Sequence, residues 1–513
     1  MPVSLLDALP EAFVSETALS SAISRGVQQG KLRKLGSRLY TRNLTDPPEA
    51  IVRRNLWQLV GAYAPGALIA DRTALENAPA SDGSIFLVAD RKRDIDLPGI
   101  TLRPRPGHAP MPSDRPFIGG LYLSSTARAF LENMRASRGR AGHVPRTLTR
   151  RELEERLDSF LRRSGPAATN QLRDEIRELG ATLRLEEEAR GLGELIGTLL
   201  GTRDAPVSAA TARARKKGRP YDPDRIALFQ VLHKALREHP PVIRMAKLRD
   251  TEGTATLAFF EAYFSNFIEG TEFAVEEAAD IVFRGVIPAE RPADAHDVLG
   301  TYRVIADTAD LSRLPARFEN FLAALRRRHA AIMDSRPDKG PGSFKQQGNQ
   351  AGSTLFVAPD LVEGTLEQGF TLYRSLEGPF ARAAFMMFLV SEVHPFADGN
   401  GRAARVMMNA ELIGAGEERI VIPTVYRSNY LAALKALTLT GTPDPLIRTL
   451  DYAQRWTAAV EWGELRVTRR NLDGCNAFLD PGEAEERGLR LRLPRDRNAD
   501  PPYGPRGIDV GGG

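Results

Sequence analysis

The chain has 513 residues, which is too long for one hydrophobic core and favours about three to four domains. With 42% apolar and 26% charged residues, its composition excludes a chain that is disordered along most of its length. The formal net charge is +5, and the single cysteine, Cys475, excludes an internal disulfide and a multi-cysteine metal site. The first residues lack a basic segment followed by an apolar one, and the most apolar stretch, 380–390, is too short to cross a bilayer. We therefore expect a cytoplasmic protein without a membrane partner.

The first predicted elements are a short helix and a hairpin. Apolar residues recur every four positions from Leu19 to Val27, ahead of Gly30, which is typical of an amphipathic helix that ends at a glycine. Residues 31–42 form two arms around a Gly-Ser pair, which predicts a tight turn. A helix followed by a basic hairpin is the outline of a winged helix-turn-helix, which we assign to residues 1–54.

This N-terminal segment carries cations and no acidic residue between Glu16 and Asp46. Such a segment suits contact with a phosphate backbone, and polar side chains of its helix suit base edges. We therefore consider DNA a candidate partner, while protein contacts or dimerisation, and hence a homo-oligomer, stay open. The candidate DNA-binding residues are Arg25, Gln28, Lys31, Arg33, Lys34 and Arg38.

The middle of the chain divides by composition into three parts. Residues 55–135 predict a mixed α/β segment, with a strand at 84–89 and a helix that starts at Ser125. Residues 136–204 are charged and helical in pattern. Residues 205–221 are small and basic without apolar spacing, which favours a solvated linker over a nucleic-acid contact.

A helical domain is predicted for residues 222–462, where apolar residues return at helical spacing. Its stretch 380–393 is apolar nearly all round, which is typical of the buried central helix of an α bundle. A C-terminal extension follows at 463–494, and the Pro- and Gly-rich residues 495–513 are expected to be disordered.

Between two helical patterns lies the string HPFADGNGRAAR, residues 394–405. Gly399 and Gly401 allow the backbone to curl, so that amide N–H groups converge at the start of the next helix, where an anion binds readily. Arg402 and Arg405 are three residues apart, so both project from one face of that helix and can neutralise a triphosphate.

Two further side chains in this string suit phosphate chemistry. Asp398 supplies an oxygen ligand for Mg²⁺, which usually binds one or two carboxylates together with phosphate oxygens. His394 follows the buried helix and has a side chain that can accept a proton from an attacking hydroxyl near neutral pH.

The string matches every defined position of the signature HPFxDGNGRxxR and so resembles the Fic (Fic/Doc) family. The resemblance implies a helical fold with a small β flap, here near residues 354–358, and transfer of AMP from ATP to a Ser, Thr or Tyr hydroxyl of a protein. It implies that His394 is the base, Asp398 the Mg²⁺ ligand and Arg405 the γ-phosphate contact. The other implied nucleotide-binding residues are Gly399, Asn400, Gly401, Arg402, Ala403, Ala404 and, in the adenine pocket, Tyr430.

A second string, SNFIEG, ends a predicted helix at about 255–270 and resembles the inhibitory motif of Fic proteins. In those relatives the glutamate pairs with the second arginine of the catalytic signature and keeps the γ-phosphate out of its productive pose. Carried over, Glu269 pairs with Arg405, and Ser265 is the serine of the motif. Some relatives use the same glutamate to remove AMP, which stays open here.

The string AISRGVQQGKLRKLGSRLYTR, residues 22–42, resembles the N-terminal winged helix of abortive-infection (AbiEi-type) antitoxin regulators. The sequence thus favours an autoinhibited adenylyltransferase that uses ATP and Mg²⁺. The alternatives are a DNA-binding regulator whose Fic domain senses nucleotide, and a Fic enzyme that transfers UMP, phosphate or phosphocholine.

Overall fold

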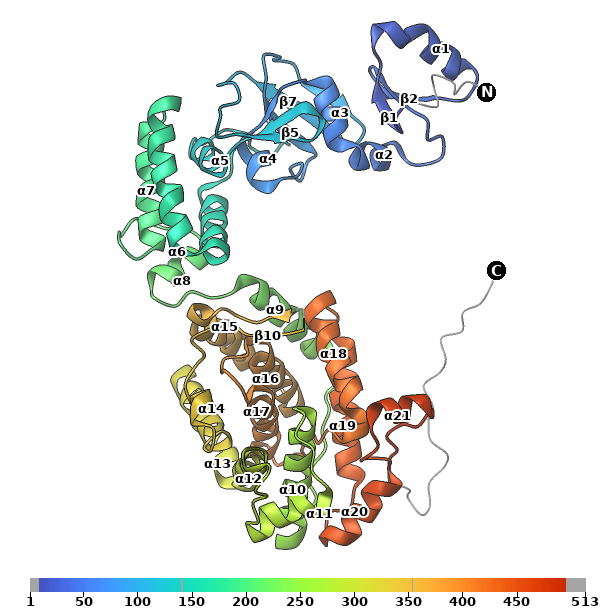
Figure 1. The fold of residues 1–513 in the computed structure, drawn as a ribbon, viewed down its shortest axis with the longest axis vertical. Coiled ribbons are helices and arrows are strands. Elements are labelled where there is room, and N and C mark those ends of the chain that lie inside the picture. Colours follow the sequence, from blue (N-terminus) through green and yellow to red (C-terminus); the bar gives the residue numbers. More distant parts are fainter. Residues whose placement is uncertain (1–8, 140–141, 353, 495–513) are drawn as a thin grey trace. The chain divides into compact units, whose positions relative to one another are not determined.

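The computed structural model describes residues 9–139, 142–352 and 354–494 (Figure 1). The chain divides into two compact units, Met1–Gly218 and Arg219–Gly513. Helices make up most of the secondary structure, so the mainly α class predicted from the sequence is confirmed. Across the described ranges, no helix combines the length and the apolar character that a membrane span requires. The predicted disordered tail, 495–513, lies outside the described residues.

The N-terminal segment contains the predicted helix and hairpin. Its elements are β1 (Ala12–Val14), α1 (Ser20–Gln28), β2 (Arg33–Gly36), β3 (Leu39–Thr41) and α2 (Pro48–Arg54). Helix α1 buries Ile23 and Gly26 and leaves Arg25 and Gln28 exposed. Strands β2 and β3 form the hairpin, and β1 pairs with β3 to complete an antiparallel sheet in the described residues of this segment.

Residues 55–135, predicted as a mixed α/β segment with a strand at 84–89, contain a six-stranded mixed sheet. Its strands are β4 (Leu68–Ile69), β5 (Ser84–Val88), β6 (Ile95–Leu97), β7 (Ile100–Arg105), β8 (Arg115–Phe117) and β9 (Leu121–Leu123), in the order β6-β7-β5-β4-β9-β8. The accompanying helices are α3 (Leu56–Tyr63), α4 (Asp71–Glu76) and α5 (Thr126–Asn133). Strand β5 is buried along its whole length, and the pairs β5–β7 and β4–β9 are parallel.

The first unit ends in α6 (Arg150–Leu183), α7 (Glu186–Leu199) and α8 (Ala210–Lys216). Helix α8 lies inside residues 205–221, so the expectation of a solvated linker is wrong for this part. Ala209 and Ala212 are buried in the same apolar cluster as residues of α6 and α7, and Arg215 pairs with Asp158 at 2.7 Å. Two alanines three residues apart are enough to bury one face of a short helix. In the sequence this apolar pattern is weak, because most of the neighbouring residues are cationic.

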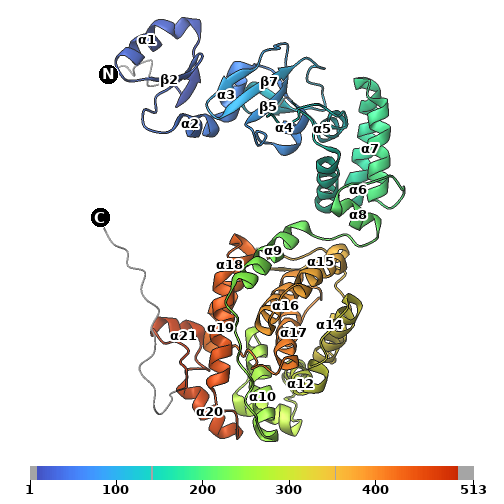
Figure 2. The same ribbon diagram turned by 180° about the vertical axis from the view of Figure 1, so that it is seen from behind.

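The second unit is a helical bundle built around two adjacent helices. Its helices are α9 (Pro223–Glu238), α10 (Thr251–Ile268), α11 (Val275–Ala279), α12 (Pro292–Ala306), α13 (Thr308–Leu311), α14 (Phe318–Ile332), α15 (Val362–Arg374), α16 (Pro379–Val393), α17 (Asn400–Gly414), α18 (Arg427–Thr440), α19 (Asp444–Ala459), α20 (Leu465–Gly474) and α21 (Pro481–Glu486). In Figures 1 and 2, α16 and α17 lie at the centre of this unit between α14 and α18. Helix α16 is buried nearly all round, as its sequence predicts.

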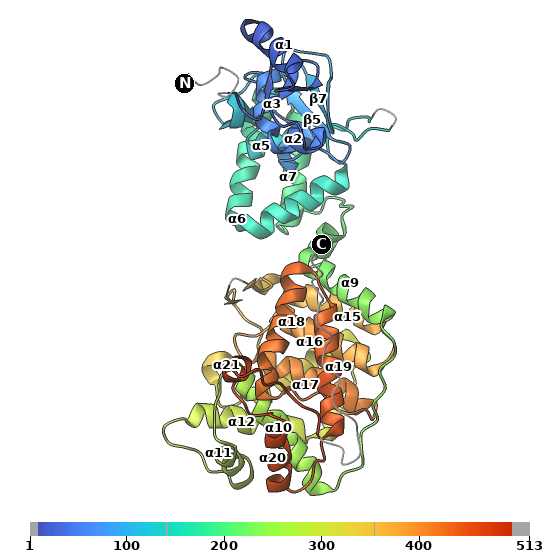
Figure 3. The same ribbon diagram turned by 90° about the vertical axis from the view of Figure 1, so that its right-hand side faces the viewer.

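Residues 463–494, predicted as an extension, contribute several side chains to the packed core of this unit. Leu472, Cys475 and Ala484 share an apolar cluster with Phe260 and Phe264 of α10. Figure 3 shows α20 beside α10. The C-terminal residues therefore hold the helix that precedes Glu269.

The stretch expected to form a β flap contains a two-residue hairpin. Strand β10 (Gln350–Ala351) pairs antiparallel with β11 (Thr354–Leu355). The predicted strand at 354–358 is thus shorter than expected, and Leu355 is exposed.

Candidate active site

The string 394–405 forms the loop from α16 to the first turns of α17, and Asn400 closes this loop. Its side-chain oxygen accepts a hydrogen bond from the N–H of Phe396 at 2.8 Å, and its amide donates to the carbonyl of Phe396 at 2.9 Å. Both residues are almost fully buried. Asn400, predicted as a nucleotide contact, therefore uses its side chain to shape the loop.

His329 of α14 supports the same loop from the other side. Its ring stacks on Phe396 with centroids 3.6 Å apart, and its Nε2 lies 2.9 Å from the carbonyl oxygen of Asp398. The N–H of Gly342 donates to Nδ1 at 3.0 Å, so we assign the proton to Nε2. Burial lowers the pKa of His329 to about 4, so its ring is neutral near neutral pH. This residue was missed, because a lone histidine in a helix carries no signal in the sequence.

His394, the predicted base, follows α16 with a left-handed backbone, φ 51°. Its ring lies flat on Phe356, with centroids 3.8 Å apart. Nδ1 lies 3.2 Å from the carbonyl oxygen of Ser391, which makes Nδ1 the donor and leaves Nε2 as the acceptor. Burial lowers the pKa of His394 to about 4, so the imidazole is unprotonated near neutral pH and the lone pair of Nε2 is available.

The first turn of α17 faces the carboxylate of Glu269. Gly399 has φ 72° and caps the helix. A Cβ added at Gly401 would clash with Oε1 of Glu269, so a larger residue at this position would require the Glu269 side chain to move. The first N–H groups of a helix lack intrahelical acceptors and attract anions. In this structure an anionic side chain therefore lies at the predicted phosphate site.

Glu269 also pairs with Arg405, as the resemblance to the inhibitory motif implies. An Nη of Arg405 lies 2.7 Å from Oε1 of Glu269. The same guanidinium donates to the hydroxyl of Ser265 at 2.9 Å and to its carbonyl oxygen at 2.8 Å. Burial has the largest single effect and disfavours the charge, but the Glu269 carboxylate and the Tyr430 hydroxyl together raise the pKa of Arg405. The three residues of the predicted inhibitory contact are thus brought together.

Arg402 has acidic partners that the sequence did not reveal. Its guanidinium lies 2.9 Å from a carboxylate oxygen of Asp297 on α12 and 3.4 Å from the side-chain oxygen of Asn266. Asp297 also accepts from Arg336 at 2.8 Å. Arg402 is buried, so this predicted phosphate contact is engaged within the protein.

Asp398, the predicted Mg²⁺ ligand, is about half exposed. One of its oxygens accepts from the N–H of Gly399 at 2.6 Å and lies 3.8 Å from the guanidinium of Arg402. Among the residues that the structure describes, no cluster of three or more His, Cys, Asp or Glu side chains could hold a metal. A single carboxylate beside a phosphate site is nevertheless a donor set that Mg²⁺ accepts.

Three other predicted nucleotide-binding residues lie in the core. Ala403 and Ala404 are fully buried, and Tyr430 is 1% exposed. The hydroxyl of Tyr430 lies 3.3 Å from the sulfur of Met387, and burial raises the pKa of this tyrosine. The ring of Tyr430 packs in the core of the bundle and its hydroxyl also interacts with Arg405, so its place in the adenine pocket stays a prediction.

Residues that precede the β hairpin in the chain connect it to the loop of residues 394–405, here called the catalytic loop. The amide of Asn349 donates to the carbonyl of Phe396 at 2.9 Å. Arg225 of α9 binds the carbonyl of Leu355 and the carboxylate of Glu392. These contacts place the exposed hairpin beside His394.

Most of the predicted DNA-binding side chains in the N-terminal segment face solvent. The exception is Arg33, which is half-buried and donates to the carbonyl of Asp46 at 3.2 Å. Arg38 is exposed and also binds the carbonyl of Ser15. The exposed members of the set are Arg25, Gln28, Lys31, Lys34 and Arg38.

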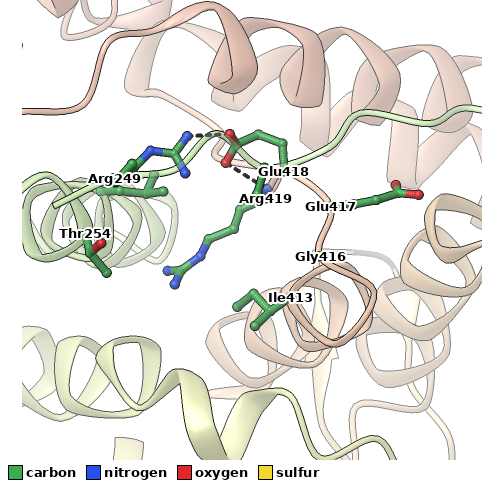
Figure 4. Close-up of a pocket in the computed structure, with 9 residues that line it drawn as sticks. Arg249, Thr254, Ile413, Gly416, Glu417, Glu418 and Arg419 are labelled. Carbon is green, nitrogen blue, oxygen red and sulfur yellow. Dashed lines mark hydrogen bonds and ion pairs between the residues drawn. The ribbon is translucent and has the colours of Figure 1, made fainter. Parts of the chain in front are cut away.

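A small cavity of about 140 Å³ lies near the N-terminus of α10, away from the string 394–405 (Figure 4). Two of its charged side chains pair, because Glu418 binds Arg249, and Glu418 also accepts from the backbone N–H of Arg419 at 3.2 Å. Arg419 in turn contacts Glu261 at 2.8 Å. We regard this cavity as a structural feature.

Residues 321–412, from α14 to α17, match the Fic/DOC family. A Fido domain-containing protein of Dictyostelium discoideum is 31% identical over 99 residues, which cover 18% of this chain and 69% of that protein. The chain therefore belongs to the Fic/DOC family.

Two further relatives are named protein adenylyltransferases. Fic-1 of Caenorhabditis elegans is 32% identical over 110 residues, 21% of each chain. Fic of Drosophila melanogaster is 27% identical over 218 residues, 40% of this chain and 43% of its own length. The chain thus spans less than half of these two proteins. A solved structure of C. elegans Fic-1 aligns with 64% of this chain and 89% of its own, at 17% identity and a TM-score of 0.36.

Proposed function

We propose that this protein is an adenylyltransferase that moves AMP from ATP to a Ser, Thr or Tyr hydroxyl of another protein. The observation that carries the proposal is the neutral imidazole of His394, whose Nε2 is left as an acceptor beside the glycine-lined start of α17. Relatives named protein adenylyltransferases support the choice of AMP as the transferred group.

In the proposed reaction the target hydroxyl attacks the α-phosphorus of ATP. Nε2 of His394 takes the hydroxyl proton, an O–P bond forms to the target, and the bond to pyrophosphate breaks. The N–H groups of the first turn of α17 and the guanidinium of Arg405 hold the phosphates that leave. Asp398 is the residue that would hold Mg²⁺, which neutralises phosphate charge when bound.

We further propose that Glu269 restrains this activity. Its carboxylate neutralises Arg405 and lies over Gly401, where the phosphates of ATP would bind. Two anions cannot share a site at low cost, so ATP binds productively only when this side chain moves away.

The function is tested by incubating the Glu269→Gly protein with Mg²⁺ and cell lysate, once with α-labelled and once with γ-labelled ATP. Transfer of AMP predicts labelled protein with the α-label alone. Labelling with the γ-label alone would instead identify phosphate transfer, and mass spectrometry of the product would reveal another group. Absence of label in all samples would favour a nucleotide-sensing regulator over an enzyme.

The N-terminal segment favours a second activity, DNA binding. It exposes Arg25, Lys31, Lys34 and Arg38 without an acidic residue between Glu16 and Asp46. Its resemblance to antitoxin regulators supports the same proposal. Fluorescence anisotropy with a DNA duplex tests it: affinity should fall as salt rises and should drop when two of these cations become alanine. Protein contacts are favoured instead if the duplex fails to bind at low salt.

A further inference from the structure

Lys345, which precedes the β hairpin, places a buried ammonium next to the catalytic loop. The residue is 4% exposed, and Nζ donates to Oδ1 of Asn349 at 2.6 Å and to the carbonyl of Val393 at 3.4 Å. Both acceptors are neutral. Burial lowers the pKa of Lys345 to about 8, an effect to which Arg225 adds. A buried cation on neutral acceptors costs stability, so it calls for an explanation.

The contacts of Lys345 bracket His394 along the chain. Its ammonium binds the carbonyl of Val393, and its own N–H donates to the carbonyl of Pro395 at 2.9 Å. The left-handed backbone of His394 is unfavourable in a non-glycine residue, so it persists only where neighbouring contacts impose it. The two hydrogen bonds of Lys345 supply such contacts on both sides.

The ring of Phe356 connects Lys345 to the imidazole. Nζ of Lys345 lies 6.0 Å from the centre of this ring, and the imidazole of His394 stacks on the ring at 3.8 Å. The N–H of Phe356 donates to the carbonyl of Asn349 at 3.1 Å. The Lys345–Asn349 pair therefore fixes both the loop that carries the imidazole and the ring on which it rests.

We propose that Lys345 is a positioning residue for His394: it holds the carbonyls on either side of the histidine, so that the imidazole stays on Phe356 with Nε2 directed to an incoming hydroxyl. Its positive charge also opposes protonation of the imidazole, while Glu269, Asp398 and the carbonyl of Ser391 favour it. The catalytic part of this role rests on the proposed transfer activity. The effect on the imidazole does not.

The test compares Lys345→Met, Lys345→Arg and, as a control, Lys234→Met, which removes an exposed ammonium from α9. In the full-length chain without nucleotide, NMR titration of labelled histidine follows His394, assigned from the His394→Ala spectrum. Loss of a nearby positive charge should raise the pKa of His394 by about one unit in Lys345→Met. Lys345→Arg should largely restore the wild-type value, and Lys234→Met should not change it.

A pKa of His394 that is unchanged in Lys345→Met, or equally raised in Lys345→Met and Lys345→Arg, would overturn the proposal. Because this titration needs no transfer, it decides the question even if no variant transfers AMP. In the Glu269→Gly background, the acid limb of kcat against pH should shift upward by the same amount in Lys345→Met. Circular dichroism of each variant checks that the chain is folded.

Discussion

The carboxylate of Glu269 lies 2.7 Å from the guanidinium of Arg405, although the two residues are 136 positions apart in the chain. Glu269 caps the C-terminus of α10, where a negative charge opposes the helix dipole. Arg405 offsets this cost, and Arg427 helps by donating to the carbonyl of Ile268 at 3.0 Å. The pair therefore joins an unfavourable helix end to the proposed phosphate site.

Replacing Glu269 with glycine should increase AMP transfer. The substitution frees Arg405 and clears the carboxylate from Gly401, so an increase of about tenfold or more is expected, which corresponds to a coupling of about 1–3 kcal/mol. Initial rates with α-labelled ATP measure this effect. Glu272→Ala removes an exposed carboxylate three residues further on and should leave the rate at the wild-type level. Equal rates for wild type and Glu269→Gly would rule out the restraint.

Replacing Ser265 with alanine should release the restraint only in part. The hydroxyl accepts from Nε of Arg405 at 2.9 Å, but the Ser265 carbonyl and Glu269 still hold the guanidinium. Loss of one hydrogen bond to a charged group, on the order of 1–2 kcal/mol, predicts an increase smaller than that of Glu269→Gly. The same rate assay with Ser312→Ala as control decides this. A rate below wild type would mean that Ser265 serves productive binding instead.

Asn400→Ala should destabilise the fold. The side chain makes two hydrogen bonds to the backbone of Phe396, and their loss leaves buried groups unsatisfied at about 1–3 kcal/mol each. Urea unfolding should show this loss, whereas Asn320→Ala, at an exposed position on α14, should change stability by less than about 0.5 kcal/mol. If the Asn400→Ala protein is as stable as the wild type, the loop does not depend on these two hydrogen bonds.

Stability should fall in acid partly because of His329. The ordinary pKa of a histidine is 6.5 and that of His329 in the fold is about 4, so the unfolded chain binds the proton first as pH falls. The stabilising contribution is complete above pH 6.5, declines as pH falls from 6.5 to 4, and amounts to roughly 3 kcal/mol. Urea unfolding at several pH values in this window should show a smaller decline for His329→Asn than for wild type. Parallel declines would remove His329 as a source of the acid sensitivity.

Local patterns in the sequence predicted the elements that carry the site. The continuous apolar run indicated α16, and two glycines indicated the turn into α17. The Glu269–Arg405 contact was predicted through a family resemblance, because no local pattern links residues so far apart. Three other contacts also join distant segments and leave no periodic pattern in the sequence. They are the contacts of Arg402 with Asp297, of His329 with Phe396 and of Lys345 with Val393. The burial of Tyr430 depends on how α18 packs, which the order of residues does not show.

The role of His394 is tested by comparing two proteins, Glu269→Gly and Glu269→Gly/His394→Ala, in the presence of α-labelled ATP, Mg²⁺ and lysate. Both should bind ATP, since His394 contributes a base and not a phosphate contact. We expect labelled protein with Glu269→Gly and none above background with the double variant. Equal labelling by the two proteins, or a Glu269→Gly protein that binds ATP and labels nothing, would contradict the proposed transfer.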